Sequence, residues 1–88
     1  MDLLVVTDEG EDSQEQRKHV QAVARRFPQL EVRECAADSE EAAQYGVIRA
    51  PGVVVHGVVL SIGQVISAGK LRRFIERIEK RARAGTEG

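Results

Sequence analysis

A single thiol is the most reactive group in this chain. Cys35 is the only cysteine among the 88 residues, so no internal disulfide can form. A cysteine at the surface could accept glutathione or form a disulfide with another chain. A free cysteine is also a common small residue of protein cores. Both interpretations of Cys35, redox chemistry and simple packing, stay open from the sequence.

Metal chemistry is not favoured by the charged and imidazole side chains. A calcium loop needs a fixed series of oxygen ligands that includes a backbone carbonyl and a bidentate glutamate. The acidic cluster near the N-terminus does not have this spacing; its members are Asp8, Glu9, Glu11 and Asp12. His19 and His56 have no second histidine or cysteine at the spacing of a metal site. The sequence therefore predicts no metal and no cofactor.

Positive charge collects in the second half of the chain. Residues 1–44 carry 11 acidic and 5 basic side chains, whereas residues 45–88 carry 3 acidic and 8 basic ones. Most of these basic residues fall on one expected helix: Lys70, Arg72, Arg73, Arg77, Lys80, Arg81 and Arg83. Such a stripe could contact phosphates, but the net charge of −1 and the 3% of aromatic residues are unlike those of a nucleic-acid-binding domain. We interpret the stripe as a solvated helix face.

The elements that would position these groups can be read from hydrophobic periodicity. Residues 3–6 form an apolar run with the length of a strand buried on both faces. A helix is expected over residues 13–27, with Asp12 or Ser13 as its N-cap and Pro28 after its end. Residues 30–35 alternate between apolar and polar, as an edge strand does.

The second half predicts a short helix, a hairpin and a long helix. The short helix should cover residues 38–45, with Asp38 as N-cap and Glu41 reaching back, and Gly46 should end it in the left-handed conformation. Strands at residues 53–55 and 58–60 flank the turn His56-Gly57. The long helix is expected over residues 67–83, where an apolar stripe recurs at helical spacing.

The order of these elements, β-α-β-α-β-β-α, predicts an α/β fold. A right-handed crossover would make the first two strands parallel, and the hairpin would add two antiparallel strands. The result is a mixed four-stranded sheet with helices on both faces. We expect one domain over residues 1–84 and a disordered tail over residues 85–88.

This order, together with one local passage, resembles the thioredoxin superfamily and especially its small, glutaredoxin-like members. The passage runs Tyr-Gly-Val-Ile-Arg-Ala-Pro-Gly-Val-Val-Val-His-Gly over residues 45–57. The resemblance implies a thioredoxin-like fold and a cis peptide bond before Pro51. It also implies that Ala50, the residue before that proline, offers its backbone to an extended substrate.

The resemblance fails at the residues that carry the superfamily's redox chemistry. That chemistry needs a thiolate at the start of the first long helix, where the helix dipole stabilises negative charge. An ungapped match places Gly10 and Ser13 at the two cysteine positions of the CxxC pair. Neither residue can form a thiolate, so dithiol-disulfide oxidoreductase activity and any catalytic residue are not expected.

The leading interpretation is a redox-inactive domain that serves as a protein-binding or adaptor module. Its unknown protein or peptide partner would lie in the groove beside the cis-proline, formed by Ala50, Pro51, Gly52, Asp12 and Ser13. The alternative is a monothiol glutaredoxin-like oxidoreductase or redox sensor that uses Cys35.

The same sequence features bear on where the protein acts. No apolar run approaches the roughly 18–20 residues that cross a bilayer. Asp2 stands where a signal peptide would be basic. Together with the lone thiol, these features predict a cytoplasmic protein that does not contact a membrane. Nucleic acid is not the expected partner, but a weak nucleic-acid or anion binder that uses the basic helix is the third interpretation.

Overall fold

The first strand is the centre of the molecule. In the computed structural model, which describes residues 1–87 and the side chains of residues 1–82, β1 spans Asp2–Thr7. Its last five residues are buried, because β1 lies between two other strands and is covered on both faces. The helix α1 follows (Glu11–Arg26), and then the strand β2 (Glu31–Ala36).

The remaining elements complete a mixed sheet of four strands. They are α2 (Glu40–Gln44), β3 (Gly52–Val55), β4 (Val58–Ile62) and α3 (Ala68–Glu87). The strand order is β2-β1-β3-β4, in which β1 pairs with β2 in parallel and with β3 antiparallel, and β3 pairs with β4 antiparallel. This is the α/β fold that the element order predicts, with β2 at an edge.

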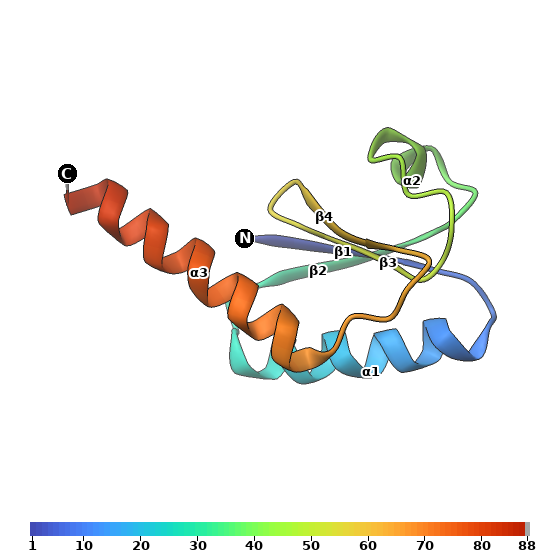
Figure 1. Cartoon of the computed structure of the whole chain (residues 1–88), viewed down its shortest axis with the longest axis horizontal. Helices are drawn as coiled ribbons and strands as arrows, with labels where there is room; N and C mark the ends of the chain where they lie inside the picture. Colours follow the sequence, from blue (N-terminus) through green and yellow to red (C-terminus); the bar gives the residue numbers. More distant parts are fainter. Residues whose placement is uncertain (88) are drawn as a thin grey trace.

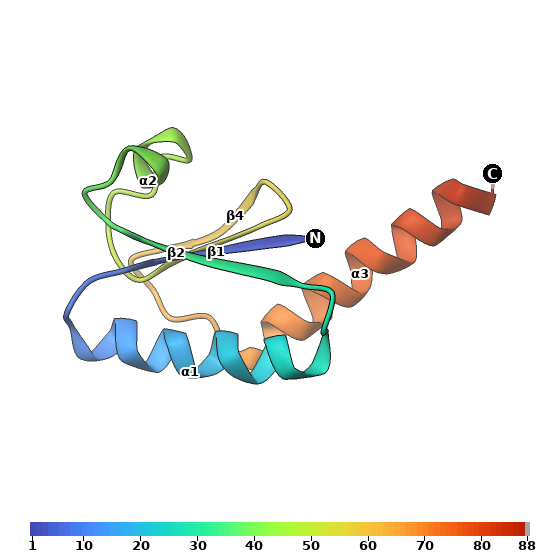
Figure 2. The same cartoon turned by 180° about the vertical axis from the view of Figure 1, so that it is seen from behind.

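The helices cover the two faces of the sheet unequally. Figures 1 and 2 show α1 and α3 on one face and α2 on the other. The larger of two buried clusters packs under α1 and α3: Leu3, Val5, Val20, Val23, Phe27, Leu30, Val53, Val55, Leu71 and Ile75. The smaller cluster lies under α2: Leu4, Val6, Ala42, Val47 and Val54. Alternate residues of β1 thus supply both cores, which explains its uninterrupted apolar sequence.

Two turns follow the sequence closely. His56 and Gly57 join β3 to β4 with φ angles of 52° and 79°, the positive values that a two-residue hairpin needs. Gly46 follows α2 with φ of 73°, as expected for the left-handed residue that ends a helix.

Both expected N-caps are wrong. The N-cap of α1 is Gly10 and not Asp12 or Ser13, which lie inside the first turn of the helix. The N-cap of α2 is Ser39 and not Asp38. The Ser39 hydroxyl accepts a hydrogen bond from the Ala42 amide (3.2 Å) and donates one to the Ala36 carbonyl (2.7 Å). A carboxylate could accept the first bond but could not donate the second.

The C-terminal end extends past the expected last turn. The backbone of α3 continues to Glu87, beyond the residue 83 at which the sequence pattern ends. Gly88 lies outside the described residues, and the predicted disordered tail over residues 85–88 stays a prediction. Among the described residues, no helix combines the length and the apolar character needed to span a bilayer.

Close packing at the first residue of β3 generates a prediction. A Cβ added at Gly52 would overlap Val47 Cγ1 and lie 3.1 Å from the Ser61 carbonyl oxygen, and Val47 is fully buried. Gly52→Ala should therefore lower the free energy of unfolding by about 1–3 kcal/mol, the usual cost of overpacking. Urea denaturation measures this cost.

Two further variants identify the cause of that loss. At Gly69, in the first turn of α3, the nearest atoms to an added Cβ are 3.9 and 4.0 Å away, so Gly69→Ala should be neutral or stabilising by up to about 1 kcal/mol. Combining Gly52→Ala with Val47→Ala should cost less than the sum of the single changes, because Val47 causes the overlap. Additive losses would contradict the steric explanation.

Candidate functional site

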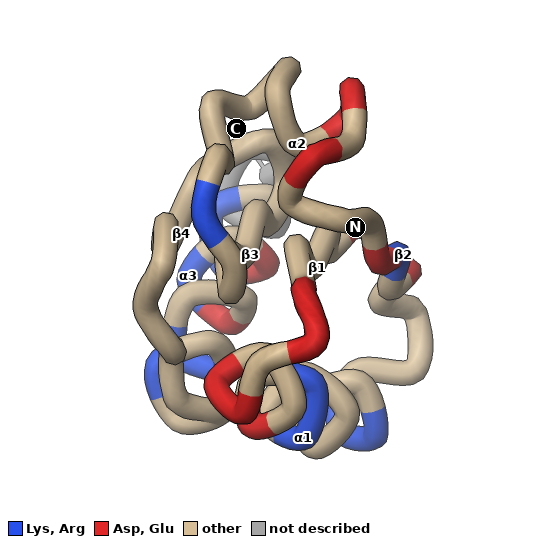
Figure 3. The backbone as a smooth tube through the Cα atoms, turned by 90° about the vertical axis from the view of Figure 1, so that its right-hand side faces the viewer, with Lys and Arg blue, Asp and Glu red and all other residues tan. Residues whose placement is uncertain are grey.

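The end of the sheet where β1 stops brings together the two segments that the sequence singles out. Val6, near the end of β1, pairs with Gly52 at the start of β3. The β1–α1 loop and the segment before β3 therefore begin side by side. Figure 3 looks onto this end and shows acidic residues between β1 and α1. Gly10, Asp12 and Ser13 come from the first segment, and Ala50, Pro51 and Gly52 from the second.

The β1–α1 loop is closed by its own side chains. The Asp8 Oδ1 atom accepts hydrogen bonds from the Gly10 amide and the Ser13 hydroxyl, both at 2.8 Å. The Ser13 hydroxyl oxygen in turn accepts from the Asp8 amide at 3.0 Å. Ser13 is fully buried. A Cβ on Gly10 would lie only 3.0 Å from Asp8 Oδ1, so a side chain at this position requires the carboxylate to move.

These bonds favour the ionised form of Asp8. Hydrogen bonds from the Gly10 amide and then the Ser13 hydroxyl hold the pKa of Asp8 below its usual value; desolvation opposes them, and the positive charge of Arg17 adds a smaller lowering effect. A carboxylate therefore lies just before α1, bonded to Gly10, which is the first of the two positions where the sequence lacks a cysteine. Chemically, the loop can hold itself together and present negative charge at the start of α1.

A second network fixes α1 and β2 to the same end. The Arg17 Nε atom donates to both carboxylate oxygens of Glu34, each at 3.2 Å, and the Thr7 hydroxyl donates to Glu34 at 3.0 Å. Arg17 also donates to the Asp8 carbonyl at 3.4 Å. The pKa of Glu34 is lowered, first by the hydrogen bond from Arg17 and also by Thr7, despite partial desolvation.

The segment before β3 has free backbone groups beside a fixed proline. The Ala50–Pro51 peptide bond is cis. Pro51 is buried, and its carbonyl accepts a hydrogen bond from the Gly63 amide at 2.8 Å. Within the described part of the chain, no hydrogen bond involves the backbone of Ile48, Arg49 or Ala50. The Ile48 side chain is 74% exposed.

Cys35 lies at the same end of the sheet but on its other face, the one that α2 covers. It sits on β2, opposite Val6 in register, and its half-buried side chain packs against the cluster under α2. The helix α1 covers the opposite face, so the thiol is not at the head of that helix. Across residues 1–82, no three histidine, cysteine or acidic side chains gather as a metal site.

Sequence reasoning missed the side chains that organise the site. Asp8, Arg17 and Glu34 carry its hydrogen bonds, yet none belongs to the expected groove. One signal was present for Asp8, because an aspartate two residues before a glycine commonly bonds to the backbone amide two positions later. No pattern in the sequence joins Arg17 to Glu34, since that pair forms only once β2 lies beside β1.

The comparisons with known proteins agree with this geometry. A family model described as a thioredoxin domain matches residues 10–76, starting at the first of the two positions that lack a cysteine. A solved structure described as the structure of a malarial protein has a TM-score of 0.67 and 13% sequence identity, and the match covers 86% of this chain and 93% of that chain. Identity this low shows the fold alone. No curated protein matches the chain.

The Asp8–Ser13 bond generates a prediction about acid stability. Because the pKa of Asp8 is lower in the folded protein than its ordinary 3.8, the stabilisation it brings is present above about pH 4 and is lost as the pH falls through the folded value. Ser13→Ala should raise the pKa of Asp8 and weaken this acid-induced loss. A carboxyl ¹³C NMR titration and urea denaturation across pH 2–6 measure the two effects.

Ser39→Ala is the matched control for this prediction. Ser39 also makes two hydrogen bonds through its hydroxyl, but neither involves Asp8. It should therefore lower stability while leaving the pKa of Asp8 unchanged. An Asp8 pKa that is the same in Ser13→Ala and in the unmodified protein would show that the Ser13 hydroxyl does not stabilise the carboxylate.

Proposed function

This chain belongs to the thioredoxin domain family, and on that basis we propose that it is a protein-binding module that performs no dithiol exchange. In this proposal an extended peptide pairs with the backbone of residues 48–50. The observation that carries the proposal is the set of unpaired backbone groups at Ile48, Arg49 and Ala50, next to a buried proline.

The free backbone supports peptide binding by strand addition. An extended peptide gains affinity from main-chain hydrogen bonds to unpaired amides and carbonyls, and gains specificity from nearby side-chain contacts. Pro51 and Gly52 are already engaged with Gly63 and β1, so they hold the segment in place without competing for the peptide. Ile48, largely exposed, offers an apolar contact to the peptide's side chains.

The charge at this end favours a basic peptide. Asp8, Glu9, Glu11 and Asp12 are all exposed on the β1–α1 loop and the first turn of α1. Among the described residues, Arg17 is the cation that contacts this group, and it also pairs with Glu34. Arg49, in the binding segment itself, forms no ion pair within residues 1–82, so acidic side chains outnumber basic ones here by four to two. Uncompensated negative charge beside a binding segment steers positively charged partners and disfavours acidic ones. Lysine or arginine in the bound peptide would meet this charge.

The loop chemistry argues against thiol exchange. A thiolate near the start of α1 would lie beside the Asp8 carboxylate and the acidic residues that follow, and like charges raise a thiol's pKa. Cys35 is the remaining candidate for redox activity. It packs among apolar side chains under α2, and no charged partner or second thiol is found with it among the described residues.

Peptide selection tests the binding proposal. A library of random nine-residue peptides should yield binders rich in lysine or arginine with at least one apolar residue.

A variant of Ile48 tests where the peptide binds. Ile48→Asp should lower the affinity for such a peptide about tenfold or more in a fluorescence-polarisation titration, because it removes the apolar contact and replaces it with a charge. Val32→Asp is the matched control. Like Ile48, Val32 has an exposed β-branched aliphatic side chain (41%), but it lies on β2 and away from the proposed binding segment. Equal affinity in both variants would overturn the proposed location.

The absence of dithiol exchange is tested separately. In an insulin-reduction assay with dithiothreitol, the protein should not raise the rate above that of the reductant alone, and Cys35→Ser should behave in the same way. A glutathione-exchange assay on the same pair examines the monothiol alternative. Activity that disappears in Cys35→Ser would replace the binding proposal with an oxidoreductase that uses this thiol.

A further inference from the structure

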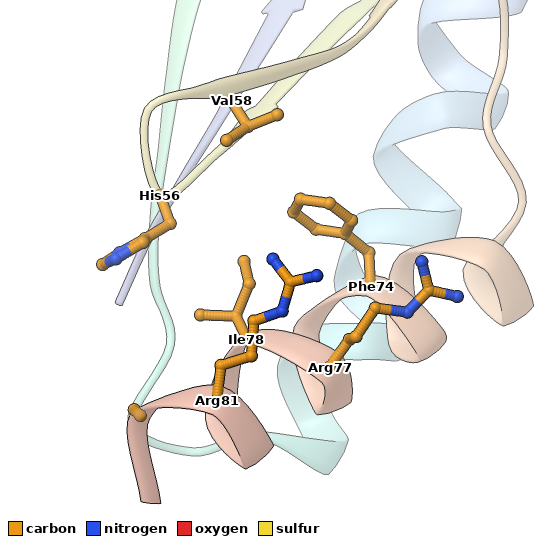
Figure 4. Close-up of a pocket in the computed structure, with 7 residues that line it drawn as sticks. His56, Val58, Phe74, Arg77, Ile78 and Arg81 are labelled. Carbon is orange, nitrogen blue, oxygen red and sulfur yellow. The ribbon is translucent and has the colours of Figure 1, made fainter. Parts of the chain in front are cut away.

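A groove lies at the opposite end of the molecule from the candidate site. It is formed between the β3–β4 turn and the middle of α3, residues 74–82, and has a volume of about 510 Å³. Figure 4 shows its lining: His56, Val58, Phe74, Arg77, Ile78, Arg81 and Ala82. Small-molecule sites usually have volumes of about 300–1,000 Å³, so the groove has room for one ligand.

The floor of the groove is hydrocarbon. Phe74 and Ile78 are partly buried because one side of each packs against the core under α3, and their other sides line the groove. Val58 faces them from the hairpin and is 47% exposed. The opening arises because α3 continues past the end of the sheet, as Figures 1 and 2 show. These side chains offer apolar contacts and no hydrogen bonds.

The rim carries positive charge that the protein does not neutralise. Arg77 and Arg81 line the groove, and with Arg73, outside it, they follow one another at intervals of four residues on α3, an arrangement in which like charges repel. The two acidic residues within this stretch are engaged elsewhere: Glu76 lies 3.7 Å from Arg72, and Glu79 accepts a hydrogen bond from Gln29 at 2.8 Å. Among residues 1–82, no acidic side chain pairs with Arg77 or Arg81.

We propose that this groove binds a fatty carboxylate of medium chain length, with its hydrocarbon chain over Val58, Phe74 and Ile78 and its carboxylate on Arg81 and Arg77. A guanidinium group matches the two oxygens of a carboxylate, which accounts for the head group. An extended peptide would bring amide groups onto a floor that cannot pair with them. A hydrocarbon chain makes no such demand, and the site is separate from the peptide segment proposed at residues 48–50.

Titration of the full chain with decanoate tests the proposal. Two-dimensional ¹H–¹⁵N NMR should show saturable shifts centred on the β3–β4 turn and residues 74–82 of α3. Decanol, which has the same chain length and no charge, should bind at least about tenfold more weakly, and 0.5 M NaCl should weaken decanoate but not decanol. Octanoate should bind about fifteenfold more weakly than decanoate, since two methylenes leave the groove.

Charge-matched variants locate the head group. Arg81→Gln should weaken decanoate about fivefold or more, and Arg77→Gln should weaken it as well, whereas Lys80→Gln removes the same charge from an exposed position outside the lining and should have little effect. Val58→Asp should abolish binding by placing a carboxylate against the ligand.

Several outcomes would overturn the proposal. In the NMR titration, these are an absence of saturable shifts up to the concentration at which decanoate forms micelles, or shifts centred on the β1–α1 loop. Decanol that binds as tightly as decanoate would also overturn it. So would a loss of decanoate affinity that is the same in Lys80→Gln and Arg81→Gln. Circular dichroism of each variant confirms that any loss of binding occurs in a folded protein. Peptide binding at residues 48–50 should be unchanged in all of them.

Discussion

The bonds that Asp8 accepts from the Gly10 amide and the Ser13 hydroxyl determine what this end of the molecule can do. They close the β1–α1 loop, set the start of α1 at Glu11 and fix a negative charge beside the first turn. An amide that is bonded to the protein's own carboxylate is not available to stabilise an added thiolate. The loop thus uses its polar groups to hold its own structure, whereas the adjoining segment, residues 48–50, keeps its free backbone groups and is the proposed binding segment.

The pairing of β1 with β3 determines where the proposed binding segment leaves the sheet. Val6 and Gly52 lie opposite each other. The close approach of Val47 leaves no room for a side chain at position 52. This contact sets where β3 begins, and so where the preceding residues leave the sheet. Because the Pro51 carbonyl is bonded to the Gly63 amide, the backbone before it emerges from a fixed point, which would reduce the entropy that the proposed partner has to remove on binding.

Much of the fold could be predicted from periodicity, since each element owes its pattern to a face that it buries. The valines of β3 and the apolar residues of β1 alternate between two cores, and the turn at His56-Gly57 follows from the angles that a hairpin needs. The N-cap residues could not be predicted as reliably. Several polar residues lie near the start of each helix, and which of them becomes the N-cap depends on hydrogen bonds to the preceding loop, as with Ser39 and the Ala36 carbonyl. The Arg17–Glu34 pair and the groove beside α3 depend on distances between elements, which a one-dimensional pattern does not contain.

The edge strand β2 carries an ion pair on each of its faces. Glu34 is held by Arg17 of α1, and Arg33 by Glu41 of α2. A strand of a second chain that paired with β2 would lie beside charged side chains that already form ion pairs within this chain. Uncontrolled polymerisation through β2 is thus opposed by the same ion pairs that fasten the helices. A protein whose proposed role is to accept a foreign strand on one side is in this way protected from accepting one on the other.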